Sequence, residues 1–307
     1  MADEVRLDEL LELRHQAHAL GLAAHHRVVS VMSGLYASVF RGRGMEFEET
    51  RRYQEGDEIR HMDWRVTART GVPHLKLFVE ERERAAVLCI DASRPMQFGT
   101  RGTLKSVQAA RAAALLGWAA SLCQDRVGAL IFGGAASEFQ FFRPTRGRRA
   151  LWRMLSALAH DGAAGAMRGD PLREALERLD RLTPTGGVVF VIADFDRDPS
   201  MLEVPLGRLR QRREVVLVAV SDVADRSLPD LGPIAFGDGA GHRVWVDTAN
   251  AAGRERYREG WDQQRTALAQ LAARLGLYLI PVWTHEEIHQ SLAAGLRRRT
   301  RQQAGRR

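Results

Sequence analysis

Acidic side chains follow two apolar stretches of the chain, at points where buried strands are expected to end. Asp91 ends the run AVLCID and has Ser93 two residues on, while Asp194 and Asp196 follow GVVFVIA. Carboxylate and hydroxyl oxygens are the ligands that a hard cation such as Mg²⁺ prefers. If the two strands are parallel, these groups meet at the sheet edge where open α/β folds bind ligands. A structural role is the alternative, with Asp91 capping a helix or pairing with an arginine and Asp194 in a turn.

A dense mixture of charged and aromatic residues lies between positions 42 and 69. A guanidinium group can bond a carboxylate bidentately while its plane packs on a ring, so partly buried ion pairs are one interpretation. A solvated, charge-balanced hairpin is the other. The charged residues are Arg43, Glu46, Arg51, Asp57, Arg60, Asp63 and Arg69, and the aromatic ones are Phe47, Tyr53 and Trp64.

From residue 85 onward, apolar runs alternate with segments that favour helix. Uninterrupted apolar runs such as GVVFVIA and EVVLVAV are typical of a parallel sheet that is buried on both faces. The predicted fold class is α/β, with a doubly wound, mostly parallel sheet. Strands are expected at 86–90, 126–132, 138–142, 187–193, 214–220, 242–246 and 277–283. Helices are expected at 101–124, 146–159, 171–182 and 249–275, with a last helix opened by a capping box of Thr284 and Glu287.

The first 84 residues predict a smaller α+β subdomain. Apolar residues recur three and four positions apart within 5–26, which indicates an amphipathic helix. Glycines interrupt the segment 28–84, in which HLKLFVEER alternates like a strand. We therefore divide the chain into 1–84, an α/β domain at 85–296, and a disordered Arg-rich tail at 297–307.

The net charge of +7 is concentrated in that tail. Without it the chain is close to neutral, so nucleic acid is not a favoured partner. A solvated tail is the simplest interpretation, and weak contact with an anionic surface is the alternative. The tail's basic residues are Arg297, Arg298, Arg299, Arg301, Arg306 and Arg307.

The cysteine pattern and the hydropathy point to a cytoplasmic protein. Cys89 and Cys123 both lie in apolar runs, where a free thiol behaves as a small hydrophobe, so no disulfide is expected. No apolar run approaches the length of a membrane span, and the N-terminal stretch is acidic and amphipathic.

Several motifs resemble those of the bacterial domain-of-unknown-function-58 family. The resemblance implies a fold similar to von Willebrand factor A domains and an association with MoxR-type AAA+ ATPases. It covers roughly residues 30 to 290. The first motifs are Gly42-Arg-Gly44-x-Glu46-Phe47 and the run from Arg51 and Tyr53 through Gly56-Asp57, Arg60 and Asp63-Trp64 to Ala68-Arg69. The later ones are Glu80-Glu-Arg82, Asp91-Ala-Ser93, Met96-x-Phe98-Gly99, Lys105 and Asp125-Arg-Val-Gly128.

The same resemblance implies a metal-ion-dependent adhesion site, built from Asp-x-Ser-x-Ser, a Thr and a further Asp. Asp91 and Ser93 match the first two positions, but the third is Pro95, which has no side-chain oxygen. Asp170 stands where the Thr is expected, and Asp194 matches the last position. The expected site is therefore degenerate, with Asp91, Ser93, Asp170 and Asp194 as metal ligands and Mg²⁺ as the candidate ion.

Two functions from different classes fit these residues. The favoured one is a non-enzymatic interaction module or adaptor that docks a partner carrying an acidic side chain. The resemblance implies that this partner is a MoxR-type AAA+ ATPase. The alternative is a metal-dependent phosphoester hydrolase using Asp91, Asp170, Asp194 and Asp196. The sequence offers this enzyme no recognisable nucleophile or base, and no phosphate-binding Gly-x-x-x-x-Gly-Lys-Ser/Thr loop.

Overall fold

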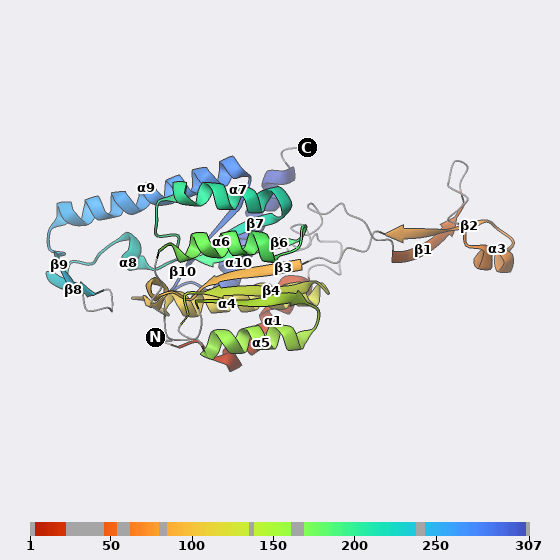
Figure 1. Ribbon diagram of the computed structural model, residues 1–307, viewed down its shortest axis with the longest axis horizontal. Coiled ribbons are helices and arrows are strands. Elements are labelled where there is room, and N and C mark those ends of the chain that lie inside the picture. Colours follow the sequence, from red (N-terminus) through yellow and green to blue (C-terminus); the bar gives the residue numbers. More distant parts are fainter. Residues whose placement is uncertain are drawn as a thin grey trace. The chain divides into compact units, whose positions relative to one another are not determined.

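The computed structural model describes residues 4–22, 46–53, 62–79, 85–134, 138–160, 169–237 and 243–304. Internal contacts divide the chain into two units. The smaller is Val39–Glu83, and the larger combines Met1–Ser38 with Arg84–Arg307. The larger unit has three layers, with one sheet between two groups of helices (Figure 1).

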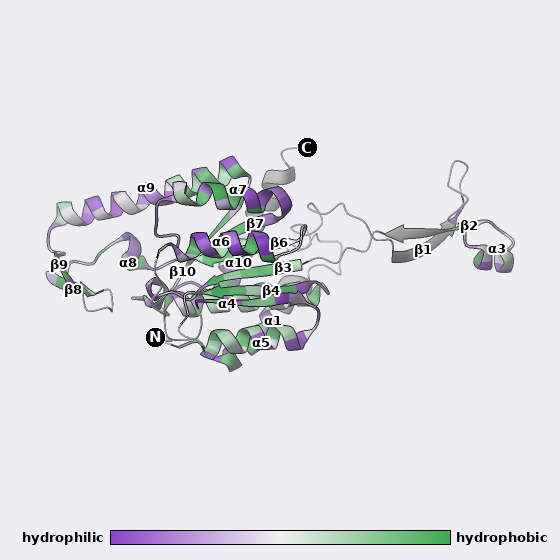
Figure 2. Cartoon of the chain, viewed as in Figure 1, coloured by the Kyte–Doolittle hydropathy of each residue, from purple (hydrophilic) through white to green (hydrophobic). Residues whose placement is uncertain are grey.

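A six-stranded sheet forms the middle layer of the larger unit. Its order is β10-β7-β6-β3-β4-β5, and every neighbouring pair is parallel except β4 and β5. The central strands are apolar along their length (Figure 2), because both of their faces are covered. The predicted doubly wound, mostly parallel sheet is confirmed. The strands are β3 (Ala85–Asp91), β4 (Arg126–Phe132), β5 (Phe139–Thr145), β6 (Val188–Ala193), β7 (Glu214–Ser221) and β10 (Tyr278–Trp283).

Helices pack on both faces of this sheet. Leucines of α6, α7 and α9 share one core with β3, β6 and β7. On the other face α4 lies against β3 and β4, and α1, α5 and α10 pack against α4. Helix α4 is buried on almost all of its sides, which explains why its sequence is rich in Ala and Leu and has few polar residues. The helices are α1 (Leu7–Leu22), α4 (Lys105–Leu122), α5 (Arg148–His160), α6 (Pro171–Leu182), α7 (Glu203–Arg212), α9 (Ala251–Leu275) and α10 (Ile288–Ala304).

The predicted strand at 242–246 is present but lies outside the main sheet. It corresponds to β9 (Arg243–Asp247), which pairs antiparallel with β8 (Pro233–Gly237). Together they form a hairpin before the 25-residue helix α9. Short helical turns complete the unit at η2 (Arg94–Gln97), η3 (Pro199–Leu202) and α8 (Val223–Arg226).

The first helix belongs to the larger unit, so the predicted boundary at residue 84 is wrong for α1. Its buried Leu10, Leu13 and Ala17 face α4 and its neighbours. The indole nitrogen of Trp118 donates to the carbonyl of Leu10 (3.0 Å). Amphipathic periodicity predicts that a helix packs somewhere, but it does not name the partner surface.

The C-terminal expectations also need correction. Helix α10 runs to Ala304, so residues 297–304 are helical where a disordered tail was predicted. The predicted capping box at Thr284 does not form, because this hydroxyl donates to Asp222 and the helix begins at Ile288. In the described part of the chain, no helix is both long enough and apolar enough to cross a membrane.

The smaller unit contains an antiparallel pair, β1 (Glu46–Arg52) and β2 (His74–Val79), with the short helix α3 (Trp64–Thr70). Asp63 begins α3, and its carboxylate accepts hydrogen bonds from the amides of Arg65 and Val66. Trp64 is exposed. The predicted ion-pair network stays a prediction, because Arg43, Asp57 and Arg60 lie outside the described residues and the side chains of Glu46 and Arg51 are not described.

Candidate functional site

Asp91 and Asp194 lie at the same edge of the main sheet. Asp91 is the last residue of β3, and Asp194 directly follows β6, its parallel neighbour. The chain adds β4 on one side of β3 and later returns to add β6 on the other side. The strand order therefore reverses between β3 and β6, and their carboxyl ends flank the switch point where such sheets bind ligands.

The carboxyl group of Asp91 is buried, with 2 % of the residue exposed. Its Oδ1 accepts a hydrogen bond from the amide of Ser93 (2.8 Å), while Oδ2 has no hydrogen-bond partner among the described residues. Burial and the nearby charge of Asp194 raise the pKa of Asp91 to about 7, against a lowering by Ser93 and Arg197. The folded protein thus keeps Asp91 protonated to a higher pH than the unfolded chain does.

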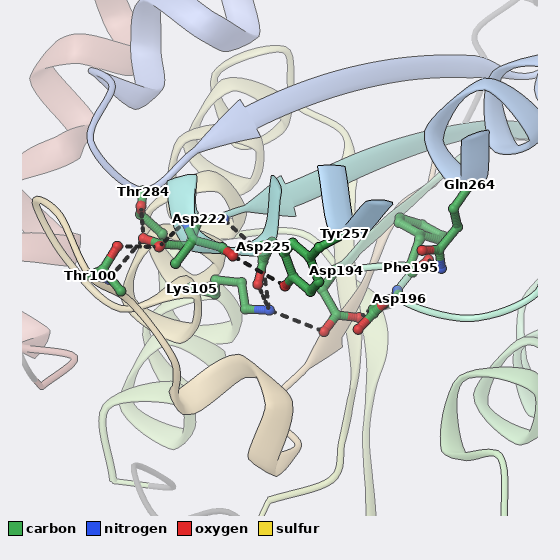
Figure 3. A network of polar contacts seen from close by, with 11 residues as sticks. Thr100, Lys105, Asp194, Phe195, Asp196, Asp222, Asp225, Tyr257, Gln264 and Thr284 are labelled. Carbon is green, nitrogen blue, oxygen red and sulfur yellow. Dashed lines mark hydrogen bonds and ion pairs between the residues drawn. The ribbon is translucent and has the colours of Figure 1, made fainter. Parts of the chain in front are cut away.

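Lys105, the first residue of α4, places a buried ammonium group within this edge. Its Nζ lies 3.4 Å from Asp194 Oδ2 and 3.4 Å from Asp225 of α8 (Figure 3). The residue is 3 % exposed. Burying a charge is costly unless it is paired, so one lysine between two carboxylates makes a mutually dependent cluster.

The loop after β6 is held in a strained conformation. Buried Phe195 has φ of 54°, in the left-handed region that non-glycine residues rarely adopt. The side-chain amide of Gln264 donates to the carbonyls of Phe195 (3.4 Å) and Arg197 (2.9 Å). The amide of Asp196 donates to Asp194 Oδ1 (3.1 Å). These contacts hold the backbone of the loop at Phe195 and Arg197 and the carboxylate of Asp194.

Asp170 is positioned differently from the other predicted ligands. Its carboxylate begins α6 by accepting from the amide of Arg173 (3.2 Å), and it also pairs with Arg197. This arrangement matches the structural alternative of a cap and an arginine pair. It places a guanidinium group beside Asp170 and near Asp91.

Asp222 joins three loops at the same edge. Its carboxylate accepts from the hydroxyls of Thr100 (2.5 Å) and Thr284 (2.6 Å) and from the amides of Thr100 and Ala224 (both 2.9 Å). Burial acts to raise the pKa of Asp222, but these hydrogen bonds lower it below its usual value. Gly102, with φ of 76°, lets the backbone approach Thr284 closely, since a Cβ would lie 2.6 Å from the Thr284 carbonyl oxygen.

The predicted ligands do not fit a divalent cation. Asp194 is paired with Lys105, Asp170 with Arg197, and Pro95 replaces a hydroxyl ligand. Arg265 adds another, partly buried cation, and burial lowers its pKa against the charges of Asp194, Asp225 and Asp196. Across the described ranges, no group of three or more His, Cys, Asp or Glu side chains is placed to hold a metal. Side chains of the protein itself supply the positive charge at this edge.

An open hollow of about 460 Å³ lies at the ends of β7 and β10, beside this cluster. It is lined by residues that include Arg226, Arg258, Trp283, His285 and Glu286. The centroid of the Trp283 ring lies 5.6 Å from that of Trp261, with the two rings tilted by 35°, and the guanidinium groups of Arg226 and Arg265 lie 5.7 and 5.0 Å from the Trp261 ring. Aromatic rings and arginines of this kind are enriched at protein interfaces.

Sequence reasoning missed the cations that complete the site, and it also missed one carboxylate. Lys105 was noted only as part of a motif, and Arg197, Asp225 and Arg265 were given no role. One signal was available for Lys105. It is one of two lysines among 45 basic residues, and it opens an apolar helix where a charge must find a partner.

An open, mostly parallel sheet with a charged site at the carboxyl edge defines a doubly wound α/β domain. The family model for proteins of unknown function DUF58 matches residues 49–267. Uncharacterized proteins of Mycobacterium bovis and Mycobacterium tuberculosis are 33 % identical over 270 residues, covering 87 % of this chain and 84 % of each relative. The chain therefore belongs to the DUF58 family.

Solved structures that resemble part of this chain at low sequence identity include the following three. BatB from Bacteroides thetaiotaomicron is 12 % identical with a TM-score of 0.40, covering 70 % of this chain and 98 % of that one. A von Willebrand factor type A protein from Catenulispora acidiphila is 11 % identical, with a TM-score of 0.39 and coverages of 73 % and 43 %. The SpRpn10 VWA domain is 13 % identical, with a TM-score of 0.37 and coverages of 69 % and 94 %.

Proposed function

We propose that this protein is a non-enzymatic interaction module that docks a partner protein at the carboxyl edge of its sheet without a metal ion. The observation that carries the proposal is the buried Lys105, whose ammonium group bridges Asp194 and Asp225. An internal cation at this position supports the loops around the edge, so the surface above them can keep one shape without an added ion.

The hollow beside the cluster is the proposed docking surface. In a metal-dependent adhesion site the ion bridges the protein to an acidic side chain of the partner. Here Arg226 and Arg258 line the hollow and offer guanidinium groups for the same purpose. Each already pairs with an exposed acid, Asp262 (3.0 Å) or Glu255 (2.5 Å). Such exposed pairs are weak, so a partner carboxylate can replace them at little cost.

The partner proposed from the family resemblance is a MoxR-type AAA+ ATPase. The direct test immobilises the purified ATPase from the same organism and measures binding of this protein by biolayer interferometry. The double variant Arg226→Glu/Arg258→Glu should lose about tenfold or more in affinity, because two arginines at the contact become repulsive. The matched control is Arg173→Glu/Arg178→Glu on α6, which reverses exposed Arg173 and half-buried Arg178, both of them paired with glutamates and away from the hollow.

Equal binding by the hollow variant, the control and the parent would reject the docking surface. A different outcome is that the parent protein binds another protein and not the ATPase. If the hollow variant loses that binding, the docking surface is supported and the ATPase is rejected as the partner. Both variants should first show unchanged melting temperatures, so that a loss of binding reflects the surface and not the fold.

A phosphoester hydrolase remains the second candidate because the pKa of Asp91, raised to about 7, suits a general base. Against it, Asp91 is almost fully buried and Asp194 is paired with Lys105. Turnover of p-nitrophenyl phosphate with Mg²⁺ or Mn²⁺ that disappears in Asp91→Asn would favour the enzyme over the interaction module.

A further inference from the structure

A second hollow, of about 520 Å³, lies where the end of α4 meets α1 and the turn before α5. Arg14 comes from α1, Trp118 and Leu122 come from α4, and Arg146 and Arg148 come from the turn and the start of α5. The volume is within the range of small-molecule sites. This hollow is separate from the proposed docking surface, because α4 carries Lys105 at its other end, about 27 Å away for 18 helical residues.

The walls of this hollow are held in place by contacts between helices. Trp118 donates its indole N–H to the carbonyl of Leu10, and Arg111 pairs with Glu9 at 2.5 Å. Both contacts attach α1 to α4. Gly147 has φ of 101°, which a residue with a Cβ rarely adopts, and no atom crowds its missing Cβ. The glycine therefore serves the turn that leads Arg146 and Arg148 into the lining.

The lining is positively charged at a place where a helix already carries positive charge. Three arginines line the hollow, and Asp125, which is buried, is the acidic residue in the lining that the structure describes. The first turn of α5 has no acidic residue and contains Arg148. A helix N-terminus carries a partial positive charge and favours anions. Basic side chains at this end are therefore repelled by the helix unless an anion lies between them and the helix.

We propose that this hollow binds a small organic anion, with a phosphate or carboxylate group attached to an apolar body. Arg14 donates to the ring of His15 (3.2 Å), and in the described part of the chain it forms no ion pair. Guanidinium forks from Arg14 and Arg148 would hold the oxyanion bidentately. Trp118 and the half-exposed Leu122 would contact the apolar body.

Isothermal titration of the full chain with phenyl phosphate, benzoate and inorganic phosphate tests the proposal. Phenyl phosphate or benzoate should bind saturably, and the tighter of the two identifies the oxyanion. Arg148→Glu should weaken binding by about tenfold or more, the loss typical of a charged hydrogen bond. The matched control is Arg149→Glu, which makes the same charge change in the same helical turn outside the lining and should stay within about threefold of the parent.

A second variant separates recognition from general electrostatic attraction. Leu122→Ser should weaken phenyl phosphate while leaving inorganic phosphate unchanged, because only the former has an apolar body. Absence of saturable binding by all three probes would overturn the proposal. So would equal losses in Arg148→Glu and Arg149→Glu, which indicate attraction to a basic surface. Circular dichroism melting of each variant checks that it is folded.

Discussion

The ammonium group of Lys105 lies 3.4 Å from a carboxylate oxygen of Asp194, at the sheet edge where the family resemblance led us to expect a metal ion. The singly charged side chain of Lys105 on α4 therefore pairs with Asp194, whose carboxylate was predicted to coordinate Mg²⁺. The same ammonium group contacts Asp225 of α8, so it ties the loop after β6 to the loop after β7. The contacts of Lys105, together with those of Asp91 and Asp222 at the same edge, lead to four predictions.

Lys105→Met should destabilise the protein strongly. The substitution keeps an unbranched side chain, one atom shorter, but leaves buried Asp194 and partly buried Asp225 without their cation. Breaking a buried pair in this way costs about 3–5 kcal/mol in the free energy of unfolding. Urea denaturation followed by circular dichroism measures the change. Arg173→Met, at an exposed pair with Glu177, is the control and should change stability by less than about 1 kcal/mol. Similar effects of the two substitutions would contradict the central role of Lys105.

Mg²⁺ should have no specific effect on the folded protein. The carboxylates of Asp194 and Asp170 are already paired with Lys105 and Arg197, so an added divalent ion would have to displace both cations. Calorimetric titration should show no saturable heat in the parent. The variant Pro95→Ser, which restores a hydroxyl, should behave in the same way because the cations remain. Saturable binding that Asp194→Ala abolishes would show that the site holds a metal after all.

Asp91 should make stability fall as the pH rises from about 4 to about 7. The usual pKa of an aspartate is 3.8, and burial beside Asp194 raises the pKa of Asp91 to about 7 in the folded protein. The folded state therefore binds more protons than the unfolded state in this window, and raising the pH favours unfolding. Asp91→Asn removes this titration while its amide oxygen can still accept from the Ser93 amide.

The measurement for Asp91 is the difference in unfolding free energy between Asp91→Asn and the parent. It should grow in favour of the variant from pH 5 to pH 8, by up to a few kcal/mol. Asp230→Asn, at an exposed residue whose pair with Arg254 is open to solvent, serves as the control and should give a nearly constant difference. A constant difference for Asp91→Asn as well would show that its pKa is not raised.

Thr284→Val should weaken the attachment of the β10 end to the rest of the edge. The hydroxyl of Thr284 donates to buried Asp222 at 2.6 Å, and valine has the same shape without the donor. Loss of a hydrogen bond to a buried charged group costs about 1.5–3 kcal/mol. Thr266→Val, at an exposed residue that donates to its own helix, should cost far less. Thermal melting of both variants compares them, and equal shifts would argue against a structural role for the Asp222 contacts.

Much of the fold was predictable because it depends on local pattern. Runs such as VVFVIA and VVLVAV are short, apolar and rich in β-branched residues, which is typical of a strand buried on both faces, and they became β6 and most of β7. The placement of Asp91 and Asp194 at one edge followed from the parallel alternation. Helix α1 was equally clear as a helix, but its packing on α4 was not, because periodicity identifies the apolar face and not the surface that covers it.

The sequence by itself determined the fold class, the carboxyl ends of β3 and β6, and the family. Each depends on residue spacing along the chain. Only the tertiary structure decided the chemistry of the edge, because Lys105, Asp194 and Asp225 are separated by 89 and 31 positions and meet only when α4, β6 and β7 pack together. Coulomb interactions act through space over a few ångströms, so sequence distance carries no information about which charges neutralise one another. A carboxylate at a strand end therefore predicts a charged site, while the folded neighbours decide whether a metal or a lysine completes it.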